Sequence, residues 1–479
     1  MDLKWKWHGA VMAACCAALG APAGAAPSAP DYAQLARDVF RQLVEIDTTQ
    51  AKGTTVAANA MAQRFRDAGF PDSDIHVLGA NASKQNLVVR LHGTGRARPI
   101  LLMGHLDVVD AARRDWDTDP FRFVTRDGFY YGRGTQDMKD GDAIYVTTLI
   151  HLKQQGYRGD RDLILALTAD EEAGDANGID WLFKHQRPLV DAEFALNHDG
   201  PGVMTRDGRP VFLQLEASEK TYADFELTVL NPGGHSSEPE PVNAIYQLSA
   251  ALGRLSRAQF PFELNDATRA YFEWDAKQQG GEQAADIRAM LATPPDPAAI
   301  ARVSRQTKDN ALVHTTCVAT RFNAGEANNA LPTRAQAIVN CRILPGHEPE
   351  QVRQELIRIL AEPALVVKYV NDFGVVLDDA TSKHATLAAP LRPDVMRAAQ
   401  QAAARFWPGM PVIPMMEIGS SDAVFANEAG LPVYQLSGDA VDRDDNRMHG
   451  RNERIGIAEF DRAVQFYYQF MSGLTARAK

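Results

Sequence analysis

The sequence predicts an α/β protein in which a smaller α+β domain is inserted into a larger domain with a mixed, mainly parallel sheet. Short apolar runs bounded by turn residues alternate with amphipathic helices in the first part of the chain. Near Tyr222 the pattern changes to that of a sheet with one half-buried face, and the earlier pattern returns after about Asp378. A chain of 479 residues is also too long for one hydrophobic core, so two or more domains are expected.

The N-terminus has the three parts of a cleavable secretory signal. A basic start precedes an apolar run at residues 9–19, and small residues follow up to Ala26. The apolar run is too short to span a bilayer. We therefore expect removal of residues 1–26 and a secreted or periplasmic protein without a membrane segment. Cys15 and Cys16 lie in the apolar run and leave lipid anchoring open as an alternative to soluble export.

Residues 27–218 are predicted to form the first part of the larger domain. Its strands are short and wholly apolar, which is typical of a sheet covered on both faces. Its helices carry apolar residues at three- and four-residue spacing. The predicted strands are 86–91, 99–103 and 163–168, and the predicted helices are 32–46, 57–68 and 141–155.

Residues 219–380 are predicted to form the inserted domain, because the order strand, helix, two strands, helix is that of an open-faced, ferredoxin-like sandwich. The predicted strands are 224–230, 312–322 and 335–343, the predicted helices are 243–255 and 352–360, and a polar excursion with helical pieces spans 265–308. Cys317 and Cys341 lie on either side of a turn at Pro332, so a hairpin could bring them opposite each other. A disulfide and two buried thiols fit the sequence equally well.

Residues 381–479 are predicted to complete the larger domain. The apolar spacing indicates helices at 393–406, 421–429 and 457–474, and a strand at 432–436. The net charge of −11 and the isoelectric point near 5.6 argue against nucleic acid as the main partner, since no basic surface is available to neutralise phosphates.

Side chains with metal-binding groups follow the predicted buried strands. His105 and Asp107 end one strand and share a face of it, because side chains two apart on a strand point the same way. Three acids, 170–172, follow a second strand, and a third strand delivers either His198 or Asp199. Ligands in α/β proteins collect at the carboxyl ends of the strands, so we expect these groups to meet there.

Two loops extend this set. The glycine-rich turn 132–141 carries Asp137, whose carboxylate could bridge two cations, and Asp140, which fits the cap of the next helix. His449 lies in a polar loop before the last helix. Any one of these sites alone is more often structural, and three adjacent acids are usually a solvated loop. Here, four successive strand ends of one sheet carry residue types that bind metals. This combined pattern predicts a site in which bound cations make the negative charge tolerable.

The ordered motifs resemble those of the two-zinc metallopeptidases that include aminoacylase, carnosinase, glutamate carboxypeptidase and succinyl-diaminopimelate desuccinylase. The motifs are Gly-His-x-Asp-Val-Val, Gly-Arg-Gly-x-x-Asp-Met-Lys-Asp-Gly, Asp-Glu-Glu-x-Gly, Asp-Gly, Gly-Gly-His-Ser-Ser and a late His-Gly. Together they cover essentially the whole mature chain. The resemblance implies a zinc-peptidase-type catalytic domain, an inserted lid domain that often mediates dimers, and hydrolysis of amide or peptide bonds.

The resemblance also implies the metal ligands. Asp137 would bridge two divalent metal ions, with Zn²⁺ expected and Co²⁺ or Mn²⁺ as alternatives. Glu172 and His449 would bind one ion, and His105 and Asp199 would bind the other. The peptide bond after Asp137 is often cis in this family, which a structure can check directly.

Other motif residues are assigned by the same resemblance. Asp107 would orient the histidine two residues before it, and Glu171 would be the general base. His235 would reach the active site of a partner subunit and stabilise the oxyanion. Asn329 and Arg342 match positions that hold the substrate, often its carboxylate, although Arg342 could equally be a surface residue of its strand. The turn 419–422 resembles the family's turn at a helix start, a place suited to an anion.

The expected substrate is small and carries a free carboxylate. We therefore expect an exopeptidase or dipeptidase, with an N-acyl-amino-acid deacylase as the alternative. A third hypothesis is a binding protein that keeps the scaffold without the chemistry. Such proteins typically lose a ligand or the base, whereas every expected position is filled here.

Overall fold

Wholly apolar strands build the central sheet of the larger domain. In the computed structural model, Ile100 and Leu102 pack into the core on one face of the sheet, and Leu101 and Met103 pack into the core on the other. A strand buried on both faces has no position for a polar side chain, which explains the apolar runs. The structure describes residues 31–172, 174–200, 202–206, 208–442 and 445–476. The predicted signal peptide, residues 1–26, lies outside them.

The central sheet has ten strands in the order β1-β2-β6-β3-β7-β18-β9-β8-β19, with β17 paired to β9. β3 runs parallel to both β6 and β7, and β18 runs parallel to β7, so the sheet is mixed with a parallel centre. The strands are β1 (Ile75–Gly79), β2 (Gln85–Leu91), β3 (Ile100–His105), β6 (Leu163–Thr168), β7 (Phe194–Asn197), β8 (Val203–Arg206), β9 (Arg209–Glu219), β17 (Val412–Glu417), β18 (Val433–Gln435) and β19 (Ala440–Asp442).

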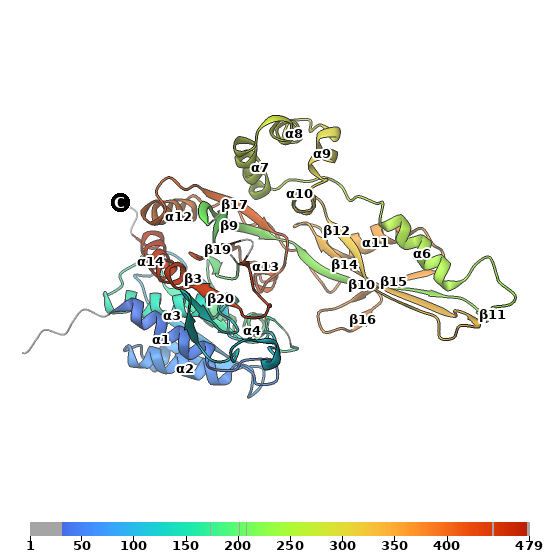
Figure 1. Cartoon of the computed structure of the whole chain (residues 1–479). Coiled ribbons are helices and arrows are strands. Elements are labelled where there is room, and N and C mark those ends of the chain that lie inside the picture. The colour runs from blue at the N-terminus through green and yellow to red at the C-terminus, as the bar shows by residue number, and fades with distance from the viewer. Residues whose placement is uncertain (1–30, 173, 201, 207, 443–444, 477–479) are drawn as a thin grey trace, which may run out of the picture.

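Helices cover both faces of this sheet (Figure 1). On one face lie α1 (Tyr32–Val44), α2 (Thr55–Asp67), α3 (Lys139–Gln154), α12 (Pro393–Phe406) and α14 (Ile457–Leu474). On the other lie α4 (Gly178–His185), α5 (Arg187–Val190) and α13 (Ala423–Glu428). Among the residues that the structure describes, no helix is both long enough and apolar enough to cross a membrane.

A separate three-stranded sheet corrects one expectation from the sequence. Within the described part of the chain, β4 (Val124–Arg126), β5 (Phe129–Tyr131) and β20 (Arg454–Gly456) pair with one another and not with the central sheet. The loop that carries Asp137 follows β5, so it does not come from a strand end of the central sheet. Three strand ends of the central sheet, those of β3, β6 and β7, carry the other groups expected along the first part of the chain. The sequence predicted four successive strand ends in one sheet. This prediction failed because β4 and β5 are short strands that resemble a loop in sequence.

The lid domain has the ferredoxin-like order expected. Its antiparallel sheet runs β12-β14-β10-β15-β16, and its helices pack on one face. The elements are β10 (Thr221–Leu230), α6 (Ala244–Leu255), β12 (Thr316–Ala324), β14 (Arg334–Ile343), α11 (Pro349–Leu360), β15 (Leu365–Val370) and β16 (Val376–Leu377). A small ribbon of β11 (Gly234–His235) and β13 (Ala330–Leu331) forms the far tip of the lid (Figure 1).

The predicted strand at 312–322 begins too early, because Leu312 and Val313 end a helix and β12 starts at Thr316. Apolar runs alone do not separate a buried helix end from a strand. The hairpin partnership is confirmed, since Cys317 lies opposite Cys341 in the pairing of β12 with β14. The two form a disulfide, which decides between the alternatives that the sequence left open.

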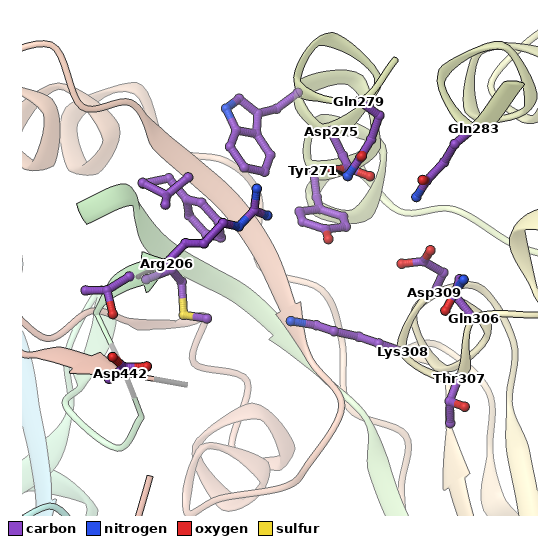
Figure 2. A pocket seen from close by; sticks show the side chains of 15 residues that line it. Arg206, Tyr271, Asp275, Gln279, Gln283, Gln306, Thr307, Lys308, Asp309 and Asp442 are labelled. Atoms are coloured by element: carbon purple, nitrogen blue, oxygen red, sulfur yellow. Dashed lines mark hydrogen bonds between the residues drawn. The ribbon is translucent and has the colours of Figure 1, made fainter. Parts of the chain in front are cut away.

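The polar excursion is a helical subdomain that packs on the catalytic domain rather than on the lid sheet. Its helices are α7 (Asp266–Gln278), α8 (Gly281–Met290), α9 (Pro297–Val303) and α10 (Thr307–Val313). Met416 of β17 joins its core, and Tyr271 and Trp274 of α7 pack against Phe212, Ile413 and Met415. A cavity of about 750 Å³ lies between this subdomain and the sheet edge (Figure 2). None of the predicted site residues lines it.

Candidate metal centre

Parallel pairing gathers the acidic and histidine side chains at one edge of the central sheet. His105 is the last residue of β3 and lies opposite Thr168, the last residue of β6. The acids Glu171 and Glu172 therefore follow directly beside it, and Asp199 comes two residues after β7, the other neighbour of β3. The expected meeting at the carboxyl ends of parallel strands is observed.

Asp137 lies between two histidines that are far apart in the sequence. Its Oδ1 is 3.1 Å from Nε2 of His105, and its Oδ2 is 3.0 Å from Nε2 of His449. The Asp137–Met138 peptide bond is cis, as expected from the resemblance. One carboxylate thus presents a different oxygen to each histidine.

His449 also contacts Glu172, with 2.9 Å between Nε2 and the carboxylate. Ligand atoms of His105, Asp137 and Glu172 all lie within 4.8 Å of one another, close enough to surround a single ion or two adjacent ions. His449 has a positive φ of 60°, which turns the polar loop so that its ring faces these acids.

Asp107 has a role that the sequence did not reveal. Its two carboxylate oxygens accept hydrogen bonds from the backbone N–H groups of Glu171 (3.1 Å) and Glu172 (3.0 Å). Its side chain is 3.8 Å from Nδ1 of His105, and that nitrogen contacts the backbone oxygen of Asp107 at 3.1 Å. Asp107 therefore orients the histidine mainly through its main chain, while its carboxylate holds the turn that carries the two glutamates.

The site holds more negative charge than its own residues neutralise. Burial raises the pKa of Glu171 well above its usual range, and Asp199 adds to this. Burial, together with Asp137, raises the pKa of Asp199 to about 7. Burial acts against the ionised form of Asp137 as well, but hydrogen bonds with His105 and His449 hold its pKa well below its usual range.

The pKa of His449 is raised as well. Hydrogen bonds to Asp137 and Glu172 raise the pKa of His449 to about 10. Without a metal, protons would therefore take the place of positive charge among these groups. A set of imidazoles and carboxylates that otherwise has to bind protons is a chemical fit for divalent cations.

The structure separates His198 from Asp199, which the sequence could not. The ring of His198 turns away from the rim, the edge of the central sheet where His105, Asp137 and Glu172 meet. Its Nε2 is 2.7 Å from Oδ2 of Asp439. Asp199 interacts electrostatically with Asp137, His105 and Glu172. Asp199 is therefore close enough to these three residues for their charges to shift its pKa, whereas the side chain of His198 contacts Asp439.

Sequence reasoning missed Glu453, which lies four residues after His449 and is completely buried. Its carboxylate accepts hydrogen bonds from the backbone N–H groups of Gly134 (3.1 Å) and Gln136 (2.7 Å) and pairs with Arg133. Arg133 in turn donates to the backbone oxygen of Gly450 at 3.1 Å. Glu453 thus joins the loop of Asp137 to the loop of His449. A buried acid in a polar loop leaves no periodic signal in the sequence.

A second cavity, of about 310 Å³, opens onto the candidate centre. Glu171 and Glu172 line it from the catalytic domain, and Tyr222 and Arg342 line it from the lid. The guanidinium of Arg342 stacks over the ring of Tyr222 at 4.7 Å. Of the two positions expected to hold substrate, Arg342 therefore faces the same space as the two glutamates.

The turn 419–422 does not offer a free anion site. The backbone N–H and hydroxyl of Ser421 both donate to Glu219, at 3.2 Å and 2.9 Å. The protein's own carboxylate thus occupies this helix start. Asp422 accepts hydrogen bonds from Asn177 at 2.6 Å and from Thr168 at 3.2 Å, so it is tied to the end of β6.

The expected cap role of Asp140 is also wrong, because it lies inside the first turn of α3, and Met138 is the cap residue.

His235 and Asn329 lie together at the far tip of the lid. His235 pairs with Ala330 across the small ribbon, and the backbone N–H of Ser236 donates to the backbone oxygen of Asn329 at 3.1 Å. Both residues are exposed. Figure 1 shows this tip at the opposite end of the molecule from β3 and β20, so a single chain does not bring either residue to the candidate centre.

Comparisons with known proteins agree with this architecture. The model of Peptidase family M20/M25/M40 matches residues 101–473. The N-fatty-acyl-amino acid synthase/hydrolase PM20D1 of Xenopus tropicalis is 28% identical over 409 residues, which cover 83% of this chain and 74% of the relative. The probable carboxypeptidase S-like 2 of Dictyostelium discoideum is 27% identical over 389 residues, which cover 78% of this chain and 71% of the relative.

Among solved structures, the M20 family metallo-carboxypeptidase Sso-CP2 of Sulfolobus solfataricus has a similar fold. The TM-score is 0.68 at 16% identity, and the match covers 92% of this chain and 99% of that one. The match to the family model spans well over half of the chain and includes every candidate metal ligand. The chain therefore belongs to peptidase family M20/M25/M40 and is a metal-dependent hydrolase of amide or peptide bonds.

Proposed function

We propose that the protein is a two-metal exopeptidase that cleaves small substrates next to a free carboxylate. The position of Asp137, with one oxygen toward His105 and the other toward His449, is the observation that carries this proposal. His105 and Asp199 would hold one ion, and Glu172 and His449 the other, with Asp137 shared. Zn²⁺ suits this mixture of imidazole and carboxylate, and Co²⁺ or Mn²⁺ could replace it.

Two such ions, when bound, would acidify a water molecule and polarise the carbonyl of the scissile bond. Glu171 then takes the proton of the attacking water and returns it to the leaving nitrogen. Asp107 serves this step by holding the backbone N–H groups of both glutamates, which keeps Glu171 and Glu172 turned to different tasks. Burial of Glu171 favours its protonated form, so the nearby cations are what would make it a base near neutral pH.

The lid residues in the second cavity would select the substrate. A guanidinium binds a carboxylate through two parallel hydrogen bonds, and Arg342 lies in the cavity that also contains the general base. Stacking on Tyr222 limits the freedom of the Arg342 side chain before the substrate arrives. A substrate carboxylate held here would place the adjacent amide bond toward Glu171.

An N-acyl amino acid is the second candidate substrate. It also carries a free carboxylate next to its amide bond, and the PM20D1 relatives are named for N-fatty-acyl-amino acids. The same cavity includes Phe373, Val424 and Phe425, whose apolar surface suits an acyl chain. The two candidates differ in what lies on the amino side of the scissile bond.

A homodimer through the lid would complete the active site. His235 is remote from the metal centre of its own chain, so His235 of the partner subunit would supply the group that stabilises the oxyanion. β12 is an edge strand of the lid sheet, and Val318 and Phe322 on it are 60% and 48% exposed. An apolar edge strand of this kind pairs readily with a second copy.

The predicted signal peptide and the disulfide both favour export. Disulfides form and persist in oxidising compartments, and Cys317–Cys341 is such a bond. N-terminal sequencing of the exported protein would test the expected cleavage near Ala26. A mature N-terminus that retains the basic start would contradict it.

Substrate class is tested with matched pairs that share one carboxyl-side amino acid. The enzyme is assayed on a dipeptide, on the N-acetyl and N-octanoyl derivatives of its second residue, and on the carboxamide of each. We expect zinc-dependent cleavage of the carboxylates and little cleavage of the carboxamides. Faster cleavage of the dipeptide supports the exopeptidase, and faster cleavage of the octanoyl compound supports the deacylase. Activity that survives complete removal of metal would contradict the proposal.

A further inference from the structure

A second group of metal-ligating side chains lies behind the candidate centre. Asp140 belongs to the first turn of α3, His198 follows β7, and Asp439 lies between β18 and β19. One potential ligand atom from each residue lies within 4.8 Å of the other two. The three side chains are 3%, 3% and 4% exposed, so solvent does not neutralise them.

The hydrogen bonding of this group is incomplete. Nε2 of His198 contacts Oδ2 of Asp439 at 2.7 Å, but Oδ1 of Asp439 and Oδ1 of Asp140 have no hydrogen-bond partner. Among the described residues, neither carboxylate forms an ion pair with a lysine or arginine. Buried carboxylate oxygens without a partner are costly, and such groups are normally satisfied by an unseen water or ion.

The packing around His198 holds its ring in place. A Cβ at Gly141 would lie 2.6 Å from Cδ2 of His198, so only glycine allows α3 to approach the ring this closely. The rings of Tyr145 and Tyr467 lie 5.5 Å away on its other sides. A histidine fixed by packing keeps its nitrogen aimed at the two carboxylates, as a preformed ligand would be.

We propose that Asp140, His198 and Asp439 form a third metal site, which binds a divalent cation of the zinc class. One neutral imidazole and two carboxylates supply two negative charges and three ligand atoms, which balance the charge of such an ion. Ligand atoms of a tetrahedral zinc ion are about 3.4 Å apart, so the His198–Asp439 contact has to open by only several tenths of an ångström.

The site would be structural rather than catalytic. It links the start of α3, the end of β7 and the segment after β18. Asp137 lies three residues before Asp140, and Asp199 directly follows His198. The third ion would therefore brace the two chain segments that present these acids to the catalytic centre, without touching the substrate cavity.

The test is a zinc count combined with anomalous diffraction on the whole mature protein. After zinc loading and gel filtration, we expect three equivalents of zinc, with one anomalous peak enclosed by Asp140, His198 and Asp439. Asp439→Asn removes the charged ligand at nearly constant size, so it is expected to lose this peak and one equivalent while the other two peaks remain. Asp286→Asn is the matched control, because Asp286 is a buried acid paired with Arg302 in the helical subdomain and is expected to keep all three equivalents.

The wild-type map decides the proposal even if Asp439→Asn does not fold. A zinc-loaded crystal with no anomalous peak among the three residues would overturn it, whatever the occupancy of the other centre. A peak at this cluster with none at His105 or His449 would support the third site and contradict the proposed two-metal mechanism. The two proposals therefore fail separately.

Discussion

Candidate functional residues occur in two regions of the molecule. At the rim of the catalytic domain they contact one another, and at the tip of the lid they are remote from the candidate metal centre. At the rim, His105 and His449 are separated by most of the chain, yet both contact Asp137. At the tip, His235 and Asn329 lie next to each other at one small ribbon and are exposed, and no group of potential metal ligands among the described residues includes His235. The first region is assembled within one chain, and the second is exposed and remote from the centre it is expected to serve.

This difference indicates which part of the proposed active site one chain forms alone and which part needs a second subunit. Metal ligands have to be fixed to within fractions of an ångström, which a packed sheet edge provides. A group that acts only when the lid meets another subunit has to be presented at the surface instead. In the proposed mechanism, the metal-binding half of the site would depend on folding, and the oxyanion-binding half would depend on association.

The largest expected effect belongs to the rim. Glu171→Gln keeps the size and hydrogen bonding of the side chain but removes the base, so we expect kcat to fall by about a thousandfold. Metal content, measured by mass spectrometry of the protein's zinc, should stay unchanged because Glu171 is not a proposed ligand. A variant that retains a tenth of the activity with its metal bound would show that Glu171 is not the base.

The next effect belongs to the tip. His235→Ala should lower kcat by about a hundredfold, as for the loss of one oxyanion-stabilising donor. Co-expression with Glu171→Gln should restore about a quarter of wild-type activity, because half of the dimers are mixed and each mixed dimer has one intact site. The control places both changes on one chain and mixes it with wild type. This control should also give about a quarter of wild-type activity, from the wild-type homodimers alone. Almost no activity in the first mixture, with about half of wild-type activity in the control, would mean that His235 acts within its own subunit. About half of wild-type activity in both mixtures would mean that His235 is not needed.

A smaller effect is expected where the lid meets the rim. Arg342→Gln should raise KM by roughly tenfold to a hundredfold for substrates with a free carboxylate, because the charge-assisted hydrogen bonds are lost. KM for the corresponding carboxamide should change little. Arg334→Gln, on the exposed start of the same strand, is the matched control. A similar rise in KM for both substrates would show that Arg342 maintains the lid fold and does not recognise the carboxylate.

The smallest effect concerns the pH dependence of the metal-free protein. The pKa of Asp107 is raised to about 6 by burial and that of Asp199 to about 7, so the folded state binds protons that the unfolded state has already released. The pKa of His449 is raised to about 10, so above its usual pKa this histidine also keeps a proton in the folded state that the unfolded state has released. The stability of the metal-free protein should therefore fall as pH rises from about 4 toward 10.

Thermal unfolding with a chelator and with zinc measures this directly. We expect the metal-free Tm to fall by roughly 5 °C between about pH 5 and pH 8, and the zinc-loaded Tm to change less, since zinc takes over the role of the protons. A metal-free Tm that rises over this interval would contradict the raised pKa values. It would also contradict the inference that the rim holds excess negative charge.

Much of the fold could be read from local patterns. The helices at 393–406 and 457–474 were expected with the bounds observed for α12 and α14, because each is amphipathic and α12 begins with a proline in its first turn. The start of β12 was not predicted, because a helix that ends in an apolar pair resembles the start of a strand. The small sheet of β4, β5 and β20 was not predicted, because strands of three residues have no distinctive period. The excursion 265–308 was recognised as helical, but its packing on the catalytic domain depends on Tyr271 and Trp274 meeting side chains far away in sequence.

The sequence by itself determined the fold class, the family resemblance and the residues that meet at the rim, because apolar runs and motif spacing are local properties of the chain. Only the tertiary structure decided what the polar groups do to one another. It placed the carboxylate of Asp107 under the glutamate turn, made Glu453 the link between two distant loops, and turned His198 away from Asp199. Hydrogen bonds and charge interactions act across space at a few ångströms, so which partners they join depends on the packed chain and not on the order of its residues.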